Sequence, residues 1–232
     1  MKYFEFKDNS SPITFSAPHG SNIYPNGDIS KEQGDRGTKE LTIKLSKLLN
    51  ANYLISNISR TYVDFNREEK QCILKKFGIE NYNETISNKE EEKRKSIHNN
   101  YFKVLKKLCT KYHFSIHSMH ETGQKGSIDE NTKRKQIVIS DLDGISFEKE
   151  KLKKLIKGFE KEGYDISYNK PFKGGYEIKY TKNYCNSIQL EIRKDLLLSA
   201  EKNSNKQNLF IDIKKINSLS NKIAKILRII ND

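Results

Sequence analysis

Cysteine is scarce in this chain, and long apolar runs are missing. The three cysteines (Cys72, Cys109 and Cys185) are odd in number and lack Cys-x-x-Cys spacing, which argues against a disulfide framework or a structural zinc knuckle. No apolar stretch approaches the ~18 residues that span a bilayer, and residues 1–5 contain no apolar targeting segment. We therefore expect a protein with no membrane span, in the reducing cytoplasm.

Proline is also scarce, with 4 residues, and no glycine- or serine-rich tract interrupts the 232-residue chain. Linkers between domains usually carry such residues. We therefore predict a single domain over residues 1–232. The polar stretch 203–208 is predicted to be a loop, and residues 209–231 are predicted to hold a C-terminal amphipathic helix.

Acidic residues are outnumbered, because 43 Lys and Arg face 30 Asp and Glu, for a net charge of +13. This balance suits an anionic partner, either a small anionic substrate or a nucleic acid. The lysines are spread along the chain, and no basic block with interleaved aromatic residues stands out. We favour solvated lysine-rich faces over a nucleic-acid surface, which is kept as an alternative.

Strand-like and helix-like segments alternate along the chain, which predicts an α/β domain. Leu41, Leu45 and Leu48, for example, recur at helical spacing. Strands are predicted over residues 13–17, 52–56, 61–65, 113–116, 136–140, 164–168, 176–180 and 187–192, and helices over 38–49, 90–111 and around 152–159.

Two of the predicted strands run into a histidine. Residues 13–17 lead to His19, and residues 113–116 lead to His117. Open α/β sheets bind their ligands at the carboxyl edge of the strands. A catalytic zinc commonly takes three ligands from His, Asp and Glu and keeps one position for water. The two histidines therefore predict a metal site, with zinc as the first candidate, and a hydrolase. The alternative is that both are structural residues.

The third zinc ligand is expected to be a carboxylate near the start of the next helix. Asp35 lies there, and Glu32, three residues earlier, is its rival. His120 is either a polar group at the rim of the site or an exposed residue. His98 and His113 are interpreted as structural.

An arginine lies near each end of the segment 59–67. Because Arg binds carboxylates bidentately, the segment can form an anion site. Arg60 is placed at a developing oxyanion, and Asn66 and Arg67 at a substrate carboxylate. The alternative is an ordinary strand end with salt bridges.

Residues 187–192 alternate in character. Ile188, Leu190 and Ile192 share one face of the predicted strand, so Gln189 and Glu191 share the other. A Glu on that face, beside a metal site, can act as general base and then as general acid. The alternative is the solvent-facing side of an edge strand.

A tight loop is predicted over residues 169–176, where Pro171 precedes the pair Gly174-Gly175. Paired glycines let the backbone approach a ligand closely, so both are candidate substrate-binding residues. The loop lacks the spacing of a dinucleotide or phosphate fingerprint.

Taken in order, six segments resemble the N-formylglutamate amidohydrolase family. They are Ala17-Pro18-His19-Gly20, Asp35-Arg36-Gly37-Thr38, Ser59-Arg60-Thr61-Tyr62-Val63-Asp64-Phe65-Asn66-Arg67, Ile116-His117-Ser118-Met119, Asn169-Lys170-Pro171-Phe172-Lys173-Gly174-Gly175-Tyr176 and Gln189-Leu190-Glu191-Ile192. Where the family commonly has an Asp before the second histidine, this chain has Ser115 and Ile116.

The resemblance implies a single three-layer α/β domain, with a mixed sheet flanked by helices as in zinc carboxypeptidases. It implies a zinc ion bound by His19, Asp35 and His117, and Glu191 as the general base. Arg60 would then lie near the carbonyl oxygen, and Asn66 with Arg67 at the substrate carboxylate.

The resulting expectation is a zinc-dependent hydrolase of a small anionic N-acyl amino acid such as N-formylglutamate. Two alternatives stay open. One is a carboxypeptidase-like peptidase that acts on short peptides or cell-wall fragments through a wider cleft. The other is a basic nucleic-acid-binding protein.

Overall fold

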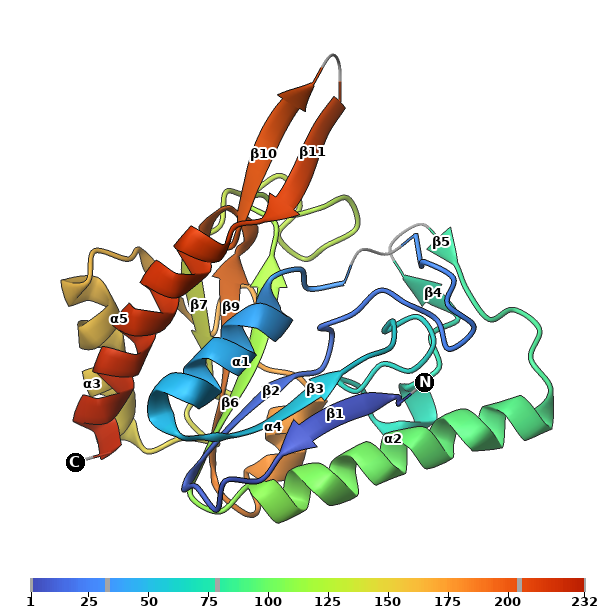
Figure 1. The fold of residues 1–232 in the computed structure, drawn as a ribbon, viewed down its shortest axis with the longest axis horizontal. Coiled ribbons are helices and arrows are strands. Elements are labelled where there is room, and N and C mark those ends of the chain that lie inside the picture. Colours follow the sequence, from blue (N-terminus) through green and yellow to red (C-terminus); the bar gives the residue numbers. More distant parts are fainter. Residues whose placement is uncertain (1, 32–33, 78–79, 204–205, 232) are drawn as a thin grey trace.

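A seven-stranded mixed sheet forms the centre of the molecule in the computed structural model, which describes residues 2–31, 34–77, 80–203 and 206–231 (Figure 1). Its strand order is β1-β3-β2-β6-β9-β7-β8. β3, β2, β6 and β9 run parallel, whereas β1 is antiparallel to β3 and β7 is antiparallel to β9. The strands are β1 (Phe4–Lys7), β2 (Ile13–Ala17), β3 (Asn52–Ser56), β6 (Tyr112–Met119), β7 (Ile137–Ser140), β8 (Ile166–Tyr168) and β9 (Asn186–Arg193).

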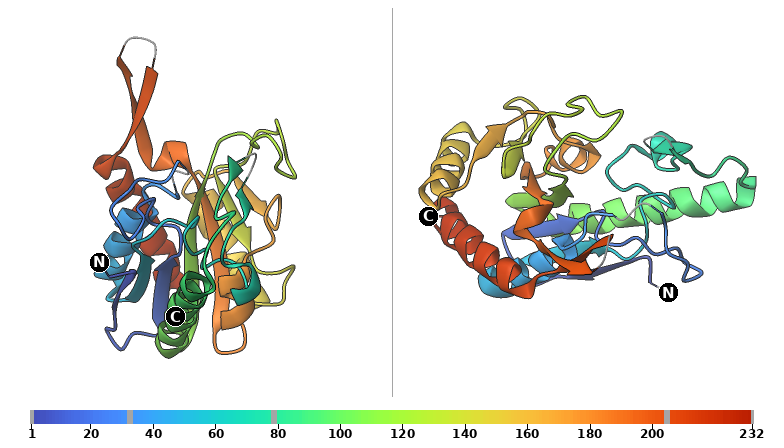
Figure 2. Two further views of the ribbon diagram at one scale, coloured as in Figure 1. Left: turned by 90° about the vertical axis from the view of Figure 1, so that its right-hand side faces the viewer. Right: turned by 90° about the horizontal axis from the view of Figure 1, so that it is seen from above.

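Helices cover both faces of the sheet and make the domain three-layered (Figures 1 and 2). On one face, the apolar sides of α1, α3 and α5 pack with Phe15, Phe114 and Leu190. On the other face, α2 packs with Leu54 and Phe65, and α4 packs against α2. The helices are α1 (Thr38–Leu49), α2 (Asn88–Leu108), α3 (Lys149–Lys161), α4 (Tyr176–Thr181) and α5 (Ile213–Asn231). The predicted α/β architecture is confirmed.

Two antiparallel pairs lie outside the central sheet. β4 (Lys76–Phe77) pairs with β5 (Glu80–Asn81), and β10 (Leu198–Asn203) pairs with β11 (Lys206–Ile211) in a ribbon that projects from the domain (Figure 1). The described part of the predicted loop 203–208 therefore belongs to two strands, and the C-terminal helix begins at Ile213 instead of residue 209. No helix within the described ranges is long and apolar enough to cross a membrane.

The predicted strand over residues 176–180 is wrong, because this segment forms α4. The alternation of Tyr176, Ile178 and Tyr180 suits a strand, but tertiary packing decides otherwise. The rings of Tyr176 and Tyr180 lie 5.0 and 4.9 Å from the ring of Phe102 on α2. Residues four apart share one face of a helix, so a helix lets both rings meet one partner.

The predicted strand over residues 61–65 is also wrong. The N–H groups of Tyr62 and Val63 donate to the carbonyl of Ser59, which folds the segment into a turn. Tyr62, Val63 and Phe65 are nevertheless buried, which explains their strand-like apolar character. The turn directs the polar residues of this segment towards the sheet edge.

β6 is longer than the four residues predicted, and it contains His117 rather than ending before it. All eight of its residues are buried, so the whole strand lies in the interior of the sheet. His117 and Glu191 are register partners on β6 and β9, as are Ser115 and Gln189. Register partners project to the same face, so these four side chains form one polar patch.

Candidate active site

A cleft of about 1030 Å³ opens where β2, β6 and β9 end. All of the residues predicted for the site line it, except Arg67: they are His19, Asp35, Arg60, Asn66, His117, Gly174, Gly175 and Glu191. His120 also lies on the wall, where it accepts a hydrogen bond from Lys194 (3.3 Å). Glu32, the rival zinc ligand, lies outside the described residues.

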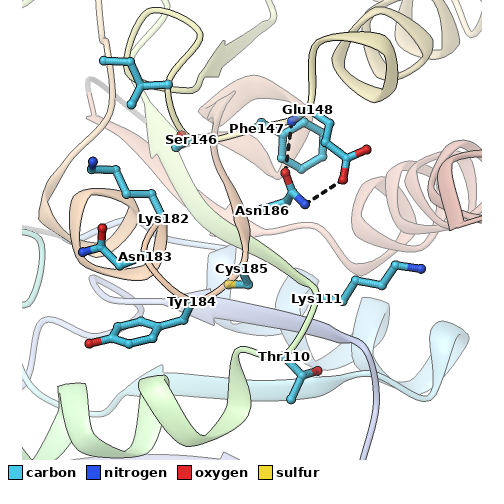
Figure 3. Close-up of a pocket in the computed structure, with 11 residues that line it drawn as sticks. Thr110, Lys111, Ser146, Phe147, Glu148, Lys182, Asn183, Tyr184, Cys185 and Asn186 are labelled. Atoms are coloured by element: carbon cyan, nitrogen blue, oxygen red, sulfur yellow. Dashed lines mark hydrogen bonds between the residues drawn. The ribbon is translucent and has the colours of Figure 1, made fainter.

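A second, shallower hollow of about 480 Å³ lies at the other end of the sheet (Figure 3). It includes Lys111, just before β6, and Asn186, the first residue of β9. Figure 3 shows the Asn186 amide bonded to Glu148, by hydrogen bonds of 3.1 and 2.8 Å. None of the predicted site residues lies there, so the cleft at the carboxyl edge is the candidate active site.

His19, Asp35 and His117 form a buried cluster, and one ligand atom from each lies within 4.8 Å of the others. Asp35 Oδ2 lies 3.3 Å from His19 Nδ1 and 2.9 Å from His117 Nδ1. The turn at Gly34 makes this possible, because its φ of +64° brings the Asp35 N–H onto the His19 carbonyl at 2.9 Å. A side chain at position 34 would lie 2.9 Å from that carbonyl oxygen. Only glycine suits this turn.

Each imidazole is held at its far nitrogen as well. His19 Nε2 donates to Asp64 Oδ1 (2.8 Å), and Arg60 binds the other oxygen of Asp64 (2.7 and 3.2 Å). His117 Nε2 lies 3.0 Å from Ser115 Oγ. Such partners fix the ring orientation and keep Nδ1 directed into the cluster, as metal-binding histidines require.

The electrostatics of the cluster favour a cation. Burial and the Arg60 charge lower the pKa of His19, but Asp64 and Asp35 outweigh them and raise it to about 9. Burial raises the pKa of Asp35, yet hydrogen bonds from His117 and His19 hold it well below its usual value. Burial likewise opposes the charge of Asp64, and Arg60 and His19 outweigh it and lower the pKa. Two imidazole nitrogens and one carboxylate oxygen, surrounded by the negative charges of Asp35 and Asp64, fit a zinc ion.

Glu191 lies on the same face of the sheet as the cluster, beside its register partner His117. Its carboxyl group accepts a hydrogen bond from the Gln189 amide (2.8 Å), as expected for two residues that share one face of a strand. Burial raises the pKa of Glu191. A carboxylate with raised proton affinity is suited to accept and return a proton near neutral pH.

Asn66 lies between the glycine pair and the cluster, with its Nδ2 3.4 Å from His117 Nε2. Its Nδ2 donates to Gln189 Oε1 (3.4 Å), and the Gly175 N–H donates to the same oxygen (2.8 Å). Arg67 differs from its neighbours: it is exposed, and its Nε lies 3.5 Å from Asp64 Oδ2. Arg67 is not one of the described residues that line the cleft.

We expect Gly175→Ala to raise the KM about tenfold or more while leaving metal content unchanged. The backbone at Gly175 has an ordinary φ of −101°, so the conformation tolerates alanine. A methyl group there would overlap the Asn66 amide and displace it. Steady-state kinetics on the purified variant measures this. The wild-type protein is the reference, and an unchanged KM would contradict the role of Asn66.

Two buried acids near the cluster, Asp64 and Glu177, have no predicted role. Asp64 was noted only as a member of the arginine-flanked segment 59–67. An acid between two arginines is nevertheless a sequence signal for a carboxylate that links an arginine to another side chain, as Asp64 links Arg60 to His19. Glu177 lies in the segment wrongly predicted as a strand, so its inward direction had no sequence signal. His98 and His113 are buried away from the cleft: His98 Nε2 donates to the Arg67 carbonyl (2.9 Å), and His113 lies 2.8 Å from Ser16 Oγ.

His113 predicts a pH dependence of stability. Burial lowers its pKa from 6.5 to about 4, so the folded protein excludes a proton that the unfolded chain binds. Stability from this residue is therefore complete above pH 6.5 and is lost as the pH falls towards 4, by about 3 kcal/mol. Urea unfolding of the metal-free protein at pH 7, 6, 5 and 4 measures it. His113→Gln should show a shallower decline, and an identical decline would contradict the assignment.

Comparison with known proteins identifies the family. A family model described as N-formylglutamate amidohydrolase matches residues 11–198. The N-formylglutamate amidohydrolase of Ralstonia eutropha JMP134 has a similar structure, with a TM-score of 0.77 and 19% identity over 100% of this chain and 98% of that one. A gene product of Agrobacterium tumefaciens has a TM-score of 0.74 and 17% identity, over 100% and 97% of the two chains. None of the curated protein sequences matches the chain. Since the family model spans most of its length, the chain belongs to the N-formylglutamate amidohydrolase family.

Proposed function

We propose that this protein is a zinc-dependent amidohydrolase that cleaves a small anionic N-acyl amino acid, with N-formylglutamate as the first candidate. The observation that carries the proposal is the buried cluster of His19, Asp35 and His117 beside Glu191, in a family of amidohydrolases. The cytoplasmic location is part of the proposal, and all three cysteines are buried free thiols.

In this proposal, zinc is held by His19, Asp35 and His117. The ion would supply Lewis acidity, which polarises a carbonyl and lowers the pKa of water towards ~7. The orientation of both imidazoles is supported by the contacts at their far nitrogens, to Asp64 and Ser115.

Glu191 is the proposed general base and general acid. It would take a proton from the attacking water and pass it to the nitrogen of the leaving amine. Its burial and its position beside His117 on the adjacent strand support this role. Water is thereby added across the amide bond, which yields the acid and the free amino acid.

Arg60 would stabilise negative charge that develops on the carbonyl oxygen, since its guanidinium lines the cleft while anchored to Asp64. Asn66 and Arg67 are proposed to anchor the substrate carboxylate, with Gly174 and Gly175 shaping the wall beside them. For Arg67 this requires its exposed side chain to turn away from Asp64 and into the cleft.

A carboxypeptidase-like activity on short peptides is the second candidate. The cleft volume of about 1030 Å³ favours it, because small-ligand sites commonly measure ~300–1,000 Å³. A cleft slightly above this range has room for more than one residue of substrate.

The test combines metal analysis with product detection. We expect about one zinc per chain, and release of formate and glutamate from N-formylglutamate. N-acetylglutamate, N-formylaspartate and a dipeptide panel distinguish the substrate classes. Preferential cleavage of peptides would replace the first candidate by the second, and absence of amide cleavage with any substrate by the zinc-loaded protein would refute both.

A further inference from the structure

Glu177 is a fully buried acid on α4 that the proposed reaction does not use. Its carboxyl group accepts hydrogen bonds from three hydroxyls on three different elements. Ser16 of β2 donates at 2.7 Å, Tyr101 of α2 donates at 2.6 Å, and Ser115 of β6 also donates. Three donors and no acceptor match the needs of a carboxylate.

The side-chain hydrogen-bond partners of the Glu177 carboxyl group are neutral hydroxyls. Within the ranges that the structure covers, no lysine or arginine forms an ion pair with Glu177. Burying a negative charge without a cation is costly. A cation bound at the far end of one of its hydrogen-bonded branches would offset this cost.

One branch runs through Ser16 to His113. Because Ser16 gives its hydroxyl proton to Glu177, its oxygen accepts from His113 Nε2 at 2.8 Å. Burial lowers the pKa of His113 to about 4, so this imidazole is neutral near pH 7. Its far nitrogen, Nδ1, lies 3.1 Å from the Thr181 hydroxyl, so this branch ends on a neutral group and does not reach the metal cluster.

The other branch runs through Ser115 to His117. Ser115 also gives its proton to Glu177, so its oxygen is left to accept from His117 Nε2 at 3.0 Å. The Asn66 amide nitrogen lies farther from that atom, at 3.4 Å. An imidazole that carries its proton on Nε2 presents a lone pair at Nδ1, which is the atom directed into the cluster.

We propose that Glu177 is a positioning residue of the metal centre, which acts through the Ser115 hydroxyl to hold His117 with its proton on Nε2 and its Nδ1 free for zinc. The inference rests on the proposed function, since it takes His117 as a zinc ligand. Under this inference, each histidine is oriented by a carboxylate: His19 by Asp64 through a direct hydrogen bond, and His117 by Glu177 through the Ser115 hydroxyl.

The test measures zinc affinity of the full-length protein by competition with a chelator. Glu177→Gln should weaken zinc binding about 10- to 100-fold, the range for partners that orient a metal-bound histidine. The amide replaces one acceptor oxygen by a donor, so the Ser115 proton can turn towards His117 Nε2 and favour the wrong tautomer. Ser115→Ala should cause a similar loss, and Ser115→Thr, which keeps the hydroxyl, should restore most of the affinity.

A double variant separates positioning from general structural support. If Glu177 acts through Ser115, adding Glu177→Gln to Ser115→Ala should cause no further loss of zinc affinity. Ser16→Ala is the matched control, because it removes a hydroxyl from the same carboxyl oxygen on the His113 branch, and its zinc affinity should stay within about twofold of wild type. In zinc-loaded protein, the Nε2–H proton of His117 should also shift upfield in the NMR spectrum of Glu177→Gln.

The outcomes are distinguishable. Unchanged zinc affinity in Glu177→Gln, or additive losses in the double variant, would overturn the inference. If Glu177→Gln does not fold, equal zinc affinities of Ser115→Ala and Ser115→Thr would overturn it instead. A loss of zinc in His117→Ala without any loss in Glu177→Gln defeats only this inference, whereas zinc binding that survives His117→Ala defeats the metal site of the proposed function.

Discussion

Turnover in Glu191→Gln is expected to fall about 10²- to 10⁴-fold while zinc content stays at the wild-type level. General acid–base catalysis by a positioned side chain contributes a factor of this size. Glutamine keeps the shape of Glu191 but cannot accept or return a proton. Because Glu191 is not part of the three-residue cluster, its neutralisation should leave the metal ligands in place.

The measurement pairs kcat with metal analysis on the same preparation. Glu148→Gln is the matched control, since the same substitution is made at the opposite end of the sheet, where Glu148 bonds to Asn186. The control should have wild-type kcat. Full activity in Glu191→Gln would remove the general-base assignment, and loss of zinc from it would show that Glu191 is itself a ligand.

Zinc binding is expected to be weakened by more than 100-fold in His19→Ala and in His117→Ala. Residues that merely orient a metal ligand are commonly worth 10- to 100-fold in affinity, and a ligand should exceed them. Both imidazoles direct Nδ1 to the same carboxylate oxygen of Asp35, so removing either opens the cluster on one side. Chelator competition followed by metal analysis measures the loss.

His120→Ala is the control for this second prediction. His120 lines the same cleft, but it lies outside the three-residue cluster and is bonded to Lys194. Its removal should leave zinc affinity unchanged. Asp35→Asn and Glu32→Gln then decide the third ligand: we expect loss of zinc only in the first, and loss only in the second would reverse the assignment.

Local sequence patterns predicted much of the fold. The bounds of β2, α1 and β3 agree with the predicted segments 13–17, 38–49 and 52–56. The placement of Ile188, Leu190 and Ile192 on one face of β9, and of Gln189 and Glu191 on the other, was also predicted, because period-two alternation is a local property of a strand. The positions of His19, His117 and Glu191 follow from the same kind of pattern, since each lies on or just after one of the parallel strands β2, β6 and β9.

The errors arose where distant residues decide local structure. Residues 176–180 alternate in polarity like a strand, yet they form a helix. This helix lets Tyr176 and Tyr180 both contact Phe102 while Glu177 is buried. Residues 61–65 are as apolar as a strand, yet the turn places Asp64 on His19, 45 residues away in the sequence. Neither contact has a periodic signature in the sequence.

By itself, then, the sequence determined an α/β domain and the residue types that its sheet edge presents, because periodicity and strand ends are local. Only the tertiary structure decided which side chains orient the two histidines at that edge. Asp64 reaches His19, and Glu177 reaches Ser115, 62 residues away in the chain, and through it His117. The strand order places β2 beside β6, and α4 packs against β6. A buried carboxylate takes its hydrogen-bond donors from its neighbours in space, and the sequence does not show which residues these are.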